Sequence, residues 1–213
     1  AKHLGKKLTS GTHRVSVPQD SGFSYAGELL QTIFLRHGLS FKNRKVSLRK
    51  VSSAGQLVYR HYNNLNLQDV IAGMMLYSNN FTANQLLLTT GMKRFGSPAS
   101  LKKGRLAVEG YLTKELGISS DQFRIAEGSG ISRKNRLTPD AVLLLLKAFL
   151  PYQHLLPREK NIPYKTGTLS GVYSMAGYLS TSDPLYFVIL LNQQKNHREK
   201  IRDILLRTDF SSY

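Results

Sequence analysis

The sequence is best interpreted outward from one stretch, Tyr164-Lys165-Thr166-Gly167-Thr168-Leu169-Ser170-Gly171-Val172, where a Lys-Thr-Gly triplet opens an apolar, β-prone segment. Lys165 supplies a positive charge, and Thr166 and Thr168 supply hydroxyl donors. Gly167 has no Cβ, so a ligand can approach its backbone closely. Such a combination at the start of a strand can hold a carboxylate-bearing acyl substrate along the edge of a sheet.

A second polar triplet, Ser78-Asn79-Asn80, stands upstream and follows the apolar helical run 70–76. Taken alone, it could be a turn between two helices, since Ser and Asn are common capping residues. The Lys-Thr-Gly triplet could likewise be an exposed strand entry. Ser-x-Asn followed by Lys-Thr-Gly, in this order, instead predicts one shared site.

Together with the segment 127–139, which begins Glu-Gly-Ser-Gly, these triplets resemble a known enzyme family. The chain is similar to the class C low-molecular-mass penicillin-binding proteins from about residue 15 to about residue 192. These are D-alanyl-D-alanine carboxypeptidases that also act as endopeptidases on peptidoglycan cross-links. The resemblance implies the penicillin-recognising serine transpeptidase/β-lactamase-like fold, and stem peptides and β-lactams as ligands.

The resemblance also implies roles for three catalytic residues. Ser78 would relay a proton to the leaving amine, and Asn80 would hydrogen-bond the acyl-side amide of the substrate. Lys165 would orient Ser78 and add positive potential, which lowers the cost of proton transfer.

The substrate-binding residues implied by the resemblance are Thr166, Gly167 and Thr168. The hydroxyl of Thr168 would meet the terminal carboxylate of the substrate, with Thr166 nearby. Its backbone N–H would form one half of the oxyanion hole, a donor worth about 2.7–4 kcal/mol in comparable enzymes.

One motif of the family has no convincing match in this sequence. It is the Ser-x-x-Lys motif, which carries the nucleophile and its base. Ser47 to Lys50 and Ser100 to Lys103 fit the pattern, but a chain with 21 serines and 16 lysines is expected to contain such pairs by chance. The first lies in a segment that reads as a strand, and the second follows Ser78, in the wrong order. We therefore expect a fold that is incomplete at the N-terminus, with the nucleophile in a missing N-terminal part and no activity of the chain alone.

Hydrophobic periodicity and turn signals predict an α+β fold, an antiparallel sheet flanked by helices. Helices are expected over residues 24–38, 67–77, 82–90, 97–116, 141–150 and 197–207. Strands are expected over 14–18, 45–51, 56–61, 123–126, 172–181 and 185–193, besides the one that begins at 164. The family resemblance divides the chain into 1–56, a lead-in and the end of an accessory region, and 57–213, the C-terminal part of the catalytic domain.

Composition narrows the classes of site. Cysteine is absent from the 213 residues, which excludes disulfides, thiolate metal sites and cysteine nucleophiles. The six histidines are scattered without metal-ligand spacing, so neither a metal nor another cofactor is expected.

No apolar run is long enough to span a membrane, and the basic N-terminus lacks the apolar run of a signal peptide. The expected location is the periplasm or cell envelope, with any signal peptide outside this chain.

The net charge of +17 has three interpretations. The first is an ordinary solvated basic surface. The second is attraction to nucleic acid, but the basic residues form no single block and no nucleic-acid-binding motif accompanies them. An envelope partner with carboxylates and phosphates fits the resemblance better.

The sequence thus predicts a serine-type D-alanyl-D-alanine carboxypeptidase/endopeptidase that works through an acyl-enzyme. The alternative is a non-catalytic module that retains the penicillin-binding groove and binds envelope polymers or a partner protein.

Overall fold

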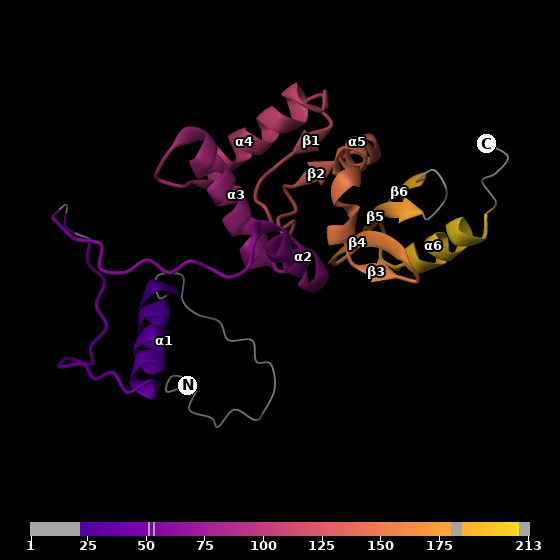
Figure 1. Cartoon of the computed structure of the whole chain (residues 1–213). Coiled ribbons are helices and arrows are strands. Elements are labelled where there is room, and N and C mark those ends of the chain that lie inside the picture. The colour runs from indigo at the N-terminus through magenta and orange to yellow at the C-terminus, as the bar shows by residue number, and fades with distance from the viewer. Residues whose placement is uncertain (1–21, 51, 53, 180–184, 209–213) are drawn as a thin grey trace. The chain divides into compact units, whose positions relative to one another are not determined.

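The computed structural model describes residues 22–50, 52, 54–179 and 185–208 (Figure 1). The chain divides into two units, 1–61 and 62–213, each of which is described by itself. The first unit contains helix α1 (Gly22–Arg36), and Gly38 follows it with a positive φ of 82°. The predicted strand 14–18 lies outside the described residues.

The strands predicted over 45–51 and 56–61 are wrong, because residues 45–50 and 56–61 adopt no regular structure. Val58, which the alternating pattern would bury on one face of a strand, is 96% exposed. Alternation alone cannot stabilise a strand, which also needs a partner to take up its backbone hydrogen bonds. In the described part of the chain, neither segment pairs with another strand.

The second unit confirms the α+β class, with helices around an antiparallel sheet (Figure 1). Its helical elements are α2 (Leu67–Tyr77), α3 (Asn80–Phe95), α4 (Leu101–Lys114), α5 (Pro139–Phe149), the 3₁₀ helix η3 (Leu150–Leu155) and α6 (Arg198–Arg207). Its strands are β1 (Phe123–Arg124), β2 (Arg136–Leu137), β3 (Arg158–Glu159), β4 (Ile162–Leu169), β5 (Val172–Leu179) and β6 (Leu185–Asn192). β1 pairs with β2, and the larger sheet has the order β3-β4-β5-β6 with antiparallel neighbours throughout.

The larger sheet is covered on both faces because successive side chains of a strand point to opposite sides. On one face, Met175 and Leu179 of β5 join a buried cluster against which Ile201 and Leu205 of α6 pack. On the other face, Tyr178 packs against α5, and its hydroxyl donates to the Leu146 carbonyl at 2.7 Å. The sheet that carries β4 is therefore supported by helices on both faces, and the first residues of β4, Ile162 to Tyr164, are buried.

Capping residues set the helix boundaries next to the first polar triplet. Asn66 begins α2 with a capping box to Asp69, which gives the helix its predicted start at residue 67. The predicted start of the next helix at 82 is two residues late, because Asn79 caps α3 by accepting from the Thr82 N–H. The helix predicted from 97 starts at Leu101 instead, with Ser100 as its N-cap.

The helix predicted over 82–90 also ends later than expected. It passes through Gly91 and continues to Phe95. A Cβ on Gly91 would lie 2.3 Å from the backbone nitrogen of Gly104 in α4. Glycine is therefore needed here for close packing of two helices and does not end the helix. The segment between α5 and β4 contains η3 and β3, which are too short for a periodic pattern to reveal.

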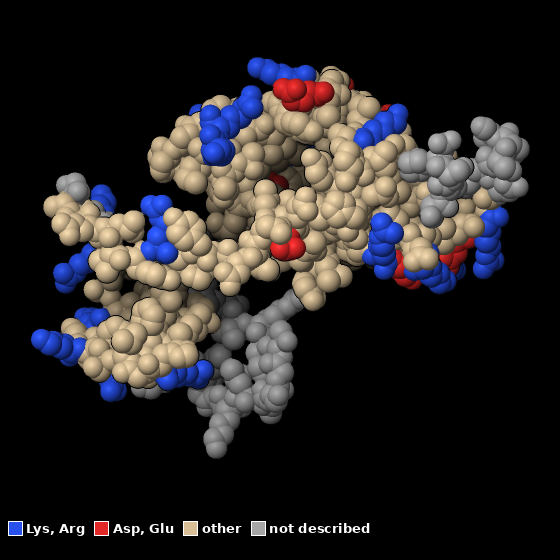
Figure 2. Space-filling model, in the orientation of Figure 1, with Lys and Arg blue, Asp and Glu red and all other residues tan. Residues whose placement is uncertain are grey.

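Basic side chains are spread over separate places on the visible face, and acidic ones stand among those of α6 (Figure 2). This arrangement matches the sequence, in which Lys and Arg form no single block. Within the described residues, no helix is both long and apolar enough to cross a bilayer.

The contact between α3 and α4 predicts opposite effects for two glycine substitutions. Gly91→Ala places a methyl group against the backbone of Gly104, so we expect the free energy of unfolding to fall by about 1–3 kcal/mol. Gly110→Ala on α4 is the control, because no described atom lies within 4 Å of the added Cβ and the helix should gain about 0.5–1 kcal/mol. Urea unfolding followed by circular dichroism measures both. Equal effects of the two changes would contradict the packing argument.

Candidate active site

The two polar triplets meet although Ser78 and Lys165 are 87 residues apart in the sequence. Ser78 ends α2 in the left-handed conformation, with φ and ψ both 49°. This conformation costs a non-glycine residue about 1–2 kcal/mol, and it turns the chain sharply between two helices. The Nζ of Lys165 on β4 donates a hydrogen bond to the Oγ of Ser78 and another, of 3.2 Å, to the Thr166 carbonyl.

A cavity of about 560 Å³ lies around this contact. All six predicted site residues line it: Ser78, Asn80, Lys165, Thr166, Gly167 and Thr168. Asn80 belongs to the wall formed by the first turn of α3, and the other wall is β4. The remaining lining includes Gly128, Ser129, Gly130 and Ile131. The structure thus brings the predicted residues to one place.

The strand neighbouring β4 adds a reason for glycine at position 167. Gly167 pairs with Ser174 of β5, and a Cβ on Gly167 would lie 2.5 Å from the Ser174 Oγ. A side chain at position 167 would therefore require the Ser174 hydroxyl to move.

Burial lowers the pKa of Lys165 from its ordinary value, and the positive charge of Arg198 lowers it further. Lys165 consequently holds its proton less tightly than a solvated lysine does. The Ser78 hydroxyl is one of the acceptors to which this lysine donates.

The segment 127–135 is built around the carboxylate of Glu127. Its oxygens accept from the Ser129 N–H (2.7 Å) and Oγ (2.5 Å), the Gly130 N–H (2.8 Å), the Ser132 N–H (3.2 Å) and the Asn135 Nδ2 (2.7 Å). Gly130 has a φ of 82°, a left-handed conformation that favours glycine. Although burial opposes ionisation of Glu127, the hydrogen bonds from Ser129 and Ser132 hold its pKa at about 2.

Two contacts attach this carboxylate-centred loop to the cavity walls. The Gly128 N–H donates to the Oδ1 of Asn84 on α3 at 2.8 Å. Arg133 donates to the Ser170 carbonyl, in the turn between β4 and β5, at 2.6 Å. The loop therefore connects the two walls that carry the triplets.

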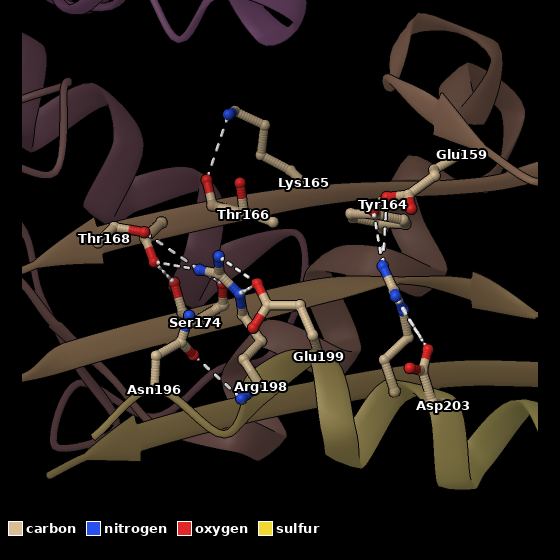
Figure 3. A network of polar contacts seen from close by, with 12 residues as sticks. Glu159, Tyr164, Lys165, Thr166, Thr168, Ser174, Asn196, Arg198, Glu199 and Asp203 are labelled. Atoms are coloured by element: carbon tan, nitrogen blue, oxygen red, sulfur yellow. Dashed lines mark hydrogen bonds and ion pairs between the residues drawn. The ribbon is translucent and has the colours of Figure 1, made fainter.

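Arg198, at the start of α6, is a further residue beside the cavity, and it is only 8% exposed. Its NH1 donates to the carbonyls of Gly167 (2.9 Å) and Ser174 (3.1 Å) and to the Thr168 Oγ1 at 3.1 Å (Figure 3). Sequence reasoning missed it because a charged residue in a basic, amphipathic helix is expected to be solvated. Glu127, Asn84 and Asn135 were missed as well, although the first and last stand in the segment that carries the family resemblance.

A smaller hollow of about 190 Å³ adjoins Lys165 on the α5 side of the sheet. Apart from Lys165, its lining is apolar: Met75, Val142, Leu145, Leu146, Phe149, Leu156 and Ala176.

Neither Ser-x-x-Lys match is arranged as a nucleophile and base. The Ser100 Oγ accepts from the Lys103 N–H to cap α4, and the Lys103 Nζ donates to the carbonyls of Gly96 and Pro98. Ser47 to Lys50 is not helical, so no helical turn aligns the two side chains. Over the described ranges, no three His, Asp or Glu side chains are grouped so that they could hold a metal ion.

Comparison with known sequences gives a consistent result. Residues 8–157 match the protein family described as the D-Ala-D-Ala carboxypeptidase 3 (S13) family. The chain is 31% identical over 195 residues to the D-alanyl-D-alanine carboxypeptidase DacB of Haemophilus influenzae, covering 79% of this chain and 40% of the relative. It is 26% identical over 189 residues to a D-alanyl-D-alanine carboxypeptidase of an Actinomadura species, covering 75% of this chain and 35% of the relative. The chain thus spans less than half the length of these relatives.

Comparison with solved structures agrees with the comparison of sequences. Penicillin binding protein 4 (dacB) of Haemophilus influenzae, in complex with a β-lactam, superposes with a TM-score of 0.72 and 26% identity over 91% of this chain and 53% of the other. The Bd3459 predatory endopeptidase of Bdellovibrio bacteriovorus shares the fold, with a TM-score of 0.54 and 16% identity over 88% of this chain and 62% of the other.

The low pKa of Glu127 predicts how the stability of its loop depends on pH. The folded value of about 2 lies below the ordinary 4.5, so the ionised carboxylate stabilises the loop fully above pH 4.5. This stabilisation falls as the pH drops from 4.5 and is lost below about 2. At pH 7, Glu127→Gln should lower the free energy of unfolding by about 1–3 kcal/mol, with faster hydrogen exchange at Ser129 and Gly130.

Asp140→Asn is the control, because Asp140 is an exposed acidic residue in the first turn of α5 and not in this loop. Urea unfolding between pH 7 and pH 2.5 should show the difference between wild type and Glu127→Gln narrowing as the pH falls. A difference that is independent of pH would contradict the role of the carboxylate.

Proposed function

Since the chain belongs to the D-Ala-D-Ala carboxypeptidase 3 (S13) family, we propose that it forms the proton-relay and substrate-binding part of a serine-type D-alanyl-D-alanine carboxypeptidase/endopeptidase. The observation that carries the proposal is the hydrogen bond from Lys165 to Ser78 in a cavity that Thr166, Gly167 and Thr168 also line. The substrates are peptidoglycan stem peptides, and β-lactams compete for the same groove. The place of action is accordingly the cell envelope.

The reaction makes and breaks one bond in each half. A serine oxygen attacks the carbonyl carbon of the scissile peptide bond, the C–N bond breaks, and the departing D-alanine amine receives its proton through Ser78. Lys165, whose pKa burial lowers, keeps the Ser78 hydroxyl in position for this transfer. Water then attacks the acyl carbon, the C–O bond to the serine breaks, the serine oxygen regains a proton from the water, and the shortened peptide leaves as a carboxylate. With a β-lactam, the broken C–N bond lies in the ring, so the amine stays attached.

An unpaired strand edge supports binding of an extended peptide. Among the described strands, β3 pairs with β4 only at Ile162 and Pro163, and the Tyr164 N–H donates to the Pro157 carbonyl at 3.0 Å, so the edge is open from Lys165 onward. A peptide can add to such an edge through backbone hydrogen bonds. In this proposal, Asn80 on the opposite wall bonds the acyl-side amide, while Thr168 bonds the terminal carboxylate through its hydroxyl and the developing oxyanion through its backbone N–H. Both residues line the cavity, which supports these roles.

The nucleophile and its base come, in this proposal, from a Ser-x-x-Lys segment elsewhere in the same protein. The apolar hollow of about 190 Å³ beside Lys165 supports this, because it offers apolar side chains against which a further segment can pack next to the cavity. The competing function is a binding module that uses the groove without catalysis. It is favoured by one observation, that neither Ser-x-x-Lys match is arranged for catalysis.

A fluorescent penicillin distinguishes the two functions. The 213-residue chain alone should form no covalent adduct, and the protein that includes a Ser-x-x-Lys segment should be labelled. In that protein, Ser78→Ala should slow labelling by about 10²–10⁴-fold, since general acid–base catalysis contributes that much. Ser100→Ala is the matched control, because Ser100 caps α4 and does not line the cavity. Its removal should leave the rate of labelling unchanged.

No adduct in a protein that includes the Ser-x-x-Lys segment would favour the binding module. Turnover of a D-alanyl-D-alanine peptide by the 213 residues, abolished by Ser47→Ala or Ser100→Ala, would overturn the placement of the nucleophile outside this chain.

A further inference from the structure

Arg198 is buried directly behind the strand that lines the cavity. It comes from the first turn of α6, and its guanidinium reaches β4 and β5 (Figure 3). One nitrogen, NH1, serves two backbone carbonyls, of Gly167 and Ser174, and the hydroxyl of Thr168. Burying a charge is costly unless it is paired, so this placement needs an explanation beyond packing.

The charge of Arg198 is only partly neutralised. Its Nε and NH2 both donate to a single oxygen of Glu199, at 3.2 and 2.9 Å. The Glu199 side chain is 46% exposed, against 10% for Arg198, so water screens the carboxylate far more than the guanidinium. Positive potential therefore persists at β4, and it adds to burial, the larger cause, in lowering the pKa of Lys165.

The hydrogen bond from Arg198 to Thr168 also limits the directions in which the Thr168 hydroxyl hydrogen can point. A hydroxyl has one hydrogen and two lone pairs. Because Arg198 donates to Oγ1 from behind the strand, one lone pair is occupied there and the hydrogen must point elsewhere. Thr168 is exposed and lines the cavity, so its O–H is available to a ligand as a donor.

We propose that Arg198 is a positioning residue that makes the Thr168 end of the cavity selective for a carboxylate over a neutral group. An oriented O–H donor backed by a guanidinium suits an anion, because hydrogen bonds to ionised groups are about twice as strong as neutral ones. The inference rests on the proposed function, since it assigns the recognition of the free C-terminus of the peptide to Arg198 acting through Thr168.

Arg202 provides a matched control on the same helix. Its side chain is 12% exposed, close to the 10% of Arg198. It donates to Glu159 at 3.2 Å, to the Tyr164 hydroxyl at 3.3 Å and to Asp203 at 2.9 Å, and thus serves the far end of β4 (Figure 3). Substituting Arg202 weakens the attachment of α6 without touching Thr168.

The test measures binding of two ligands to the 213-residue chain by NMR titration. One is an acyl-D-alanyl-D-alanine peptide with a free carboxylate, and the other is the same peptide as its C-terminal amide. The wild-type chain should prefer the carboxylate about tenfold or more. Arg198→Met should remove this preference and leave amide binding unchanged, Arg198→Lys should restore part of it, and Arg202→Met should retain it.

Preference for the carboxylate that survives Arg198→Met would overturn the proposal, as would equal loss in the Arg202→Met chain. If neither peptide binds the wild-type chain, the proposed function is contradicted, and acetate then tests Arg198 separately. Saturable acetate shifts of the Thr168 amide that Arg198→Met abolishes would uphold the inference, and their absence in the wild type would refute it.

Discussion

The attachment of β4 to α6 is the constraint on which the rest of the site depends. Arg198 and Arg202, one helical turn apart, bind the two ends of the strand, and Ile201 and Leu205 pack against the core between them. The other face of the sheet rests on α5 through Tyr178. From this fixed strand, the long side chain of Lys165 extends to the Ser78 hydroxyl.

The opposite wall is made rigid by different means. Ser78 holds a left-handed conformation because two well-capped helices meet at it, and α3 in turn packs closely on α4 through Gly91 and Gly104. The Glu127 loop then connects this wall to β4 through Asn84 and Arg133. Precise placement of a polar pair thus follows from rigid supporting elements, as a catalytic geometry requires.

Residue chemistry in a fixed order predicted the shared cavity, because Ser78 and Lys165 carry their signal in their own side chains. Helix α2 was predicted with its bounds, because Asn66 and an unbroken apolar run define it locally. The predictions that depended on distant partners were the weaker ones. Alternation over 45–51 and 56–61 suggested strands without partners, and Gly91 looked like a stop although its role is to admit Gly104. Burial of Arg198 likewise depends on acceptors 24 to 31 residues away, which no local pattern encodes.

The open edge of β4 has one more consequence, for solubility. Unpaired backbone donors and acceptors on an edge strand are a template on which a second copy could dock and start aggregation. A lysine on such an edge discourages that pairing, because two copies would bring like charges together and bury them. Lys165 is therefore suited to oppose self-association at the open edge of β4, in addition to its proposed role in the site.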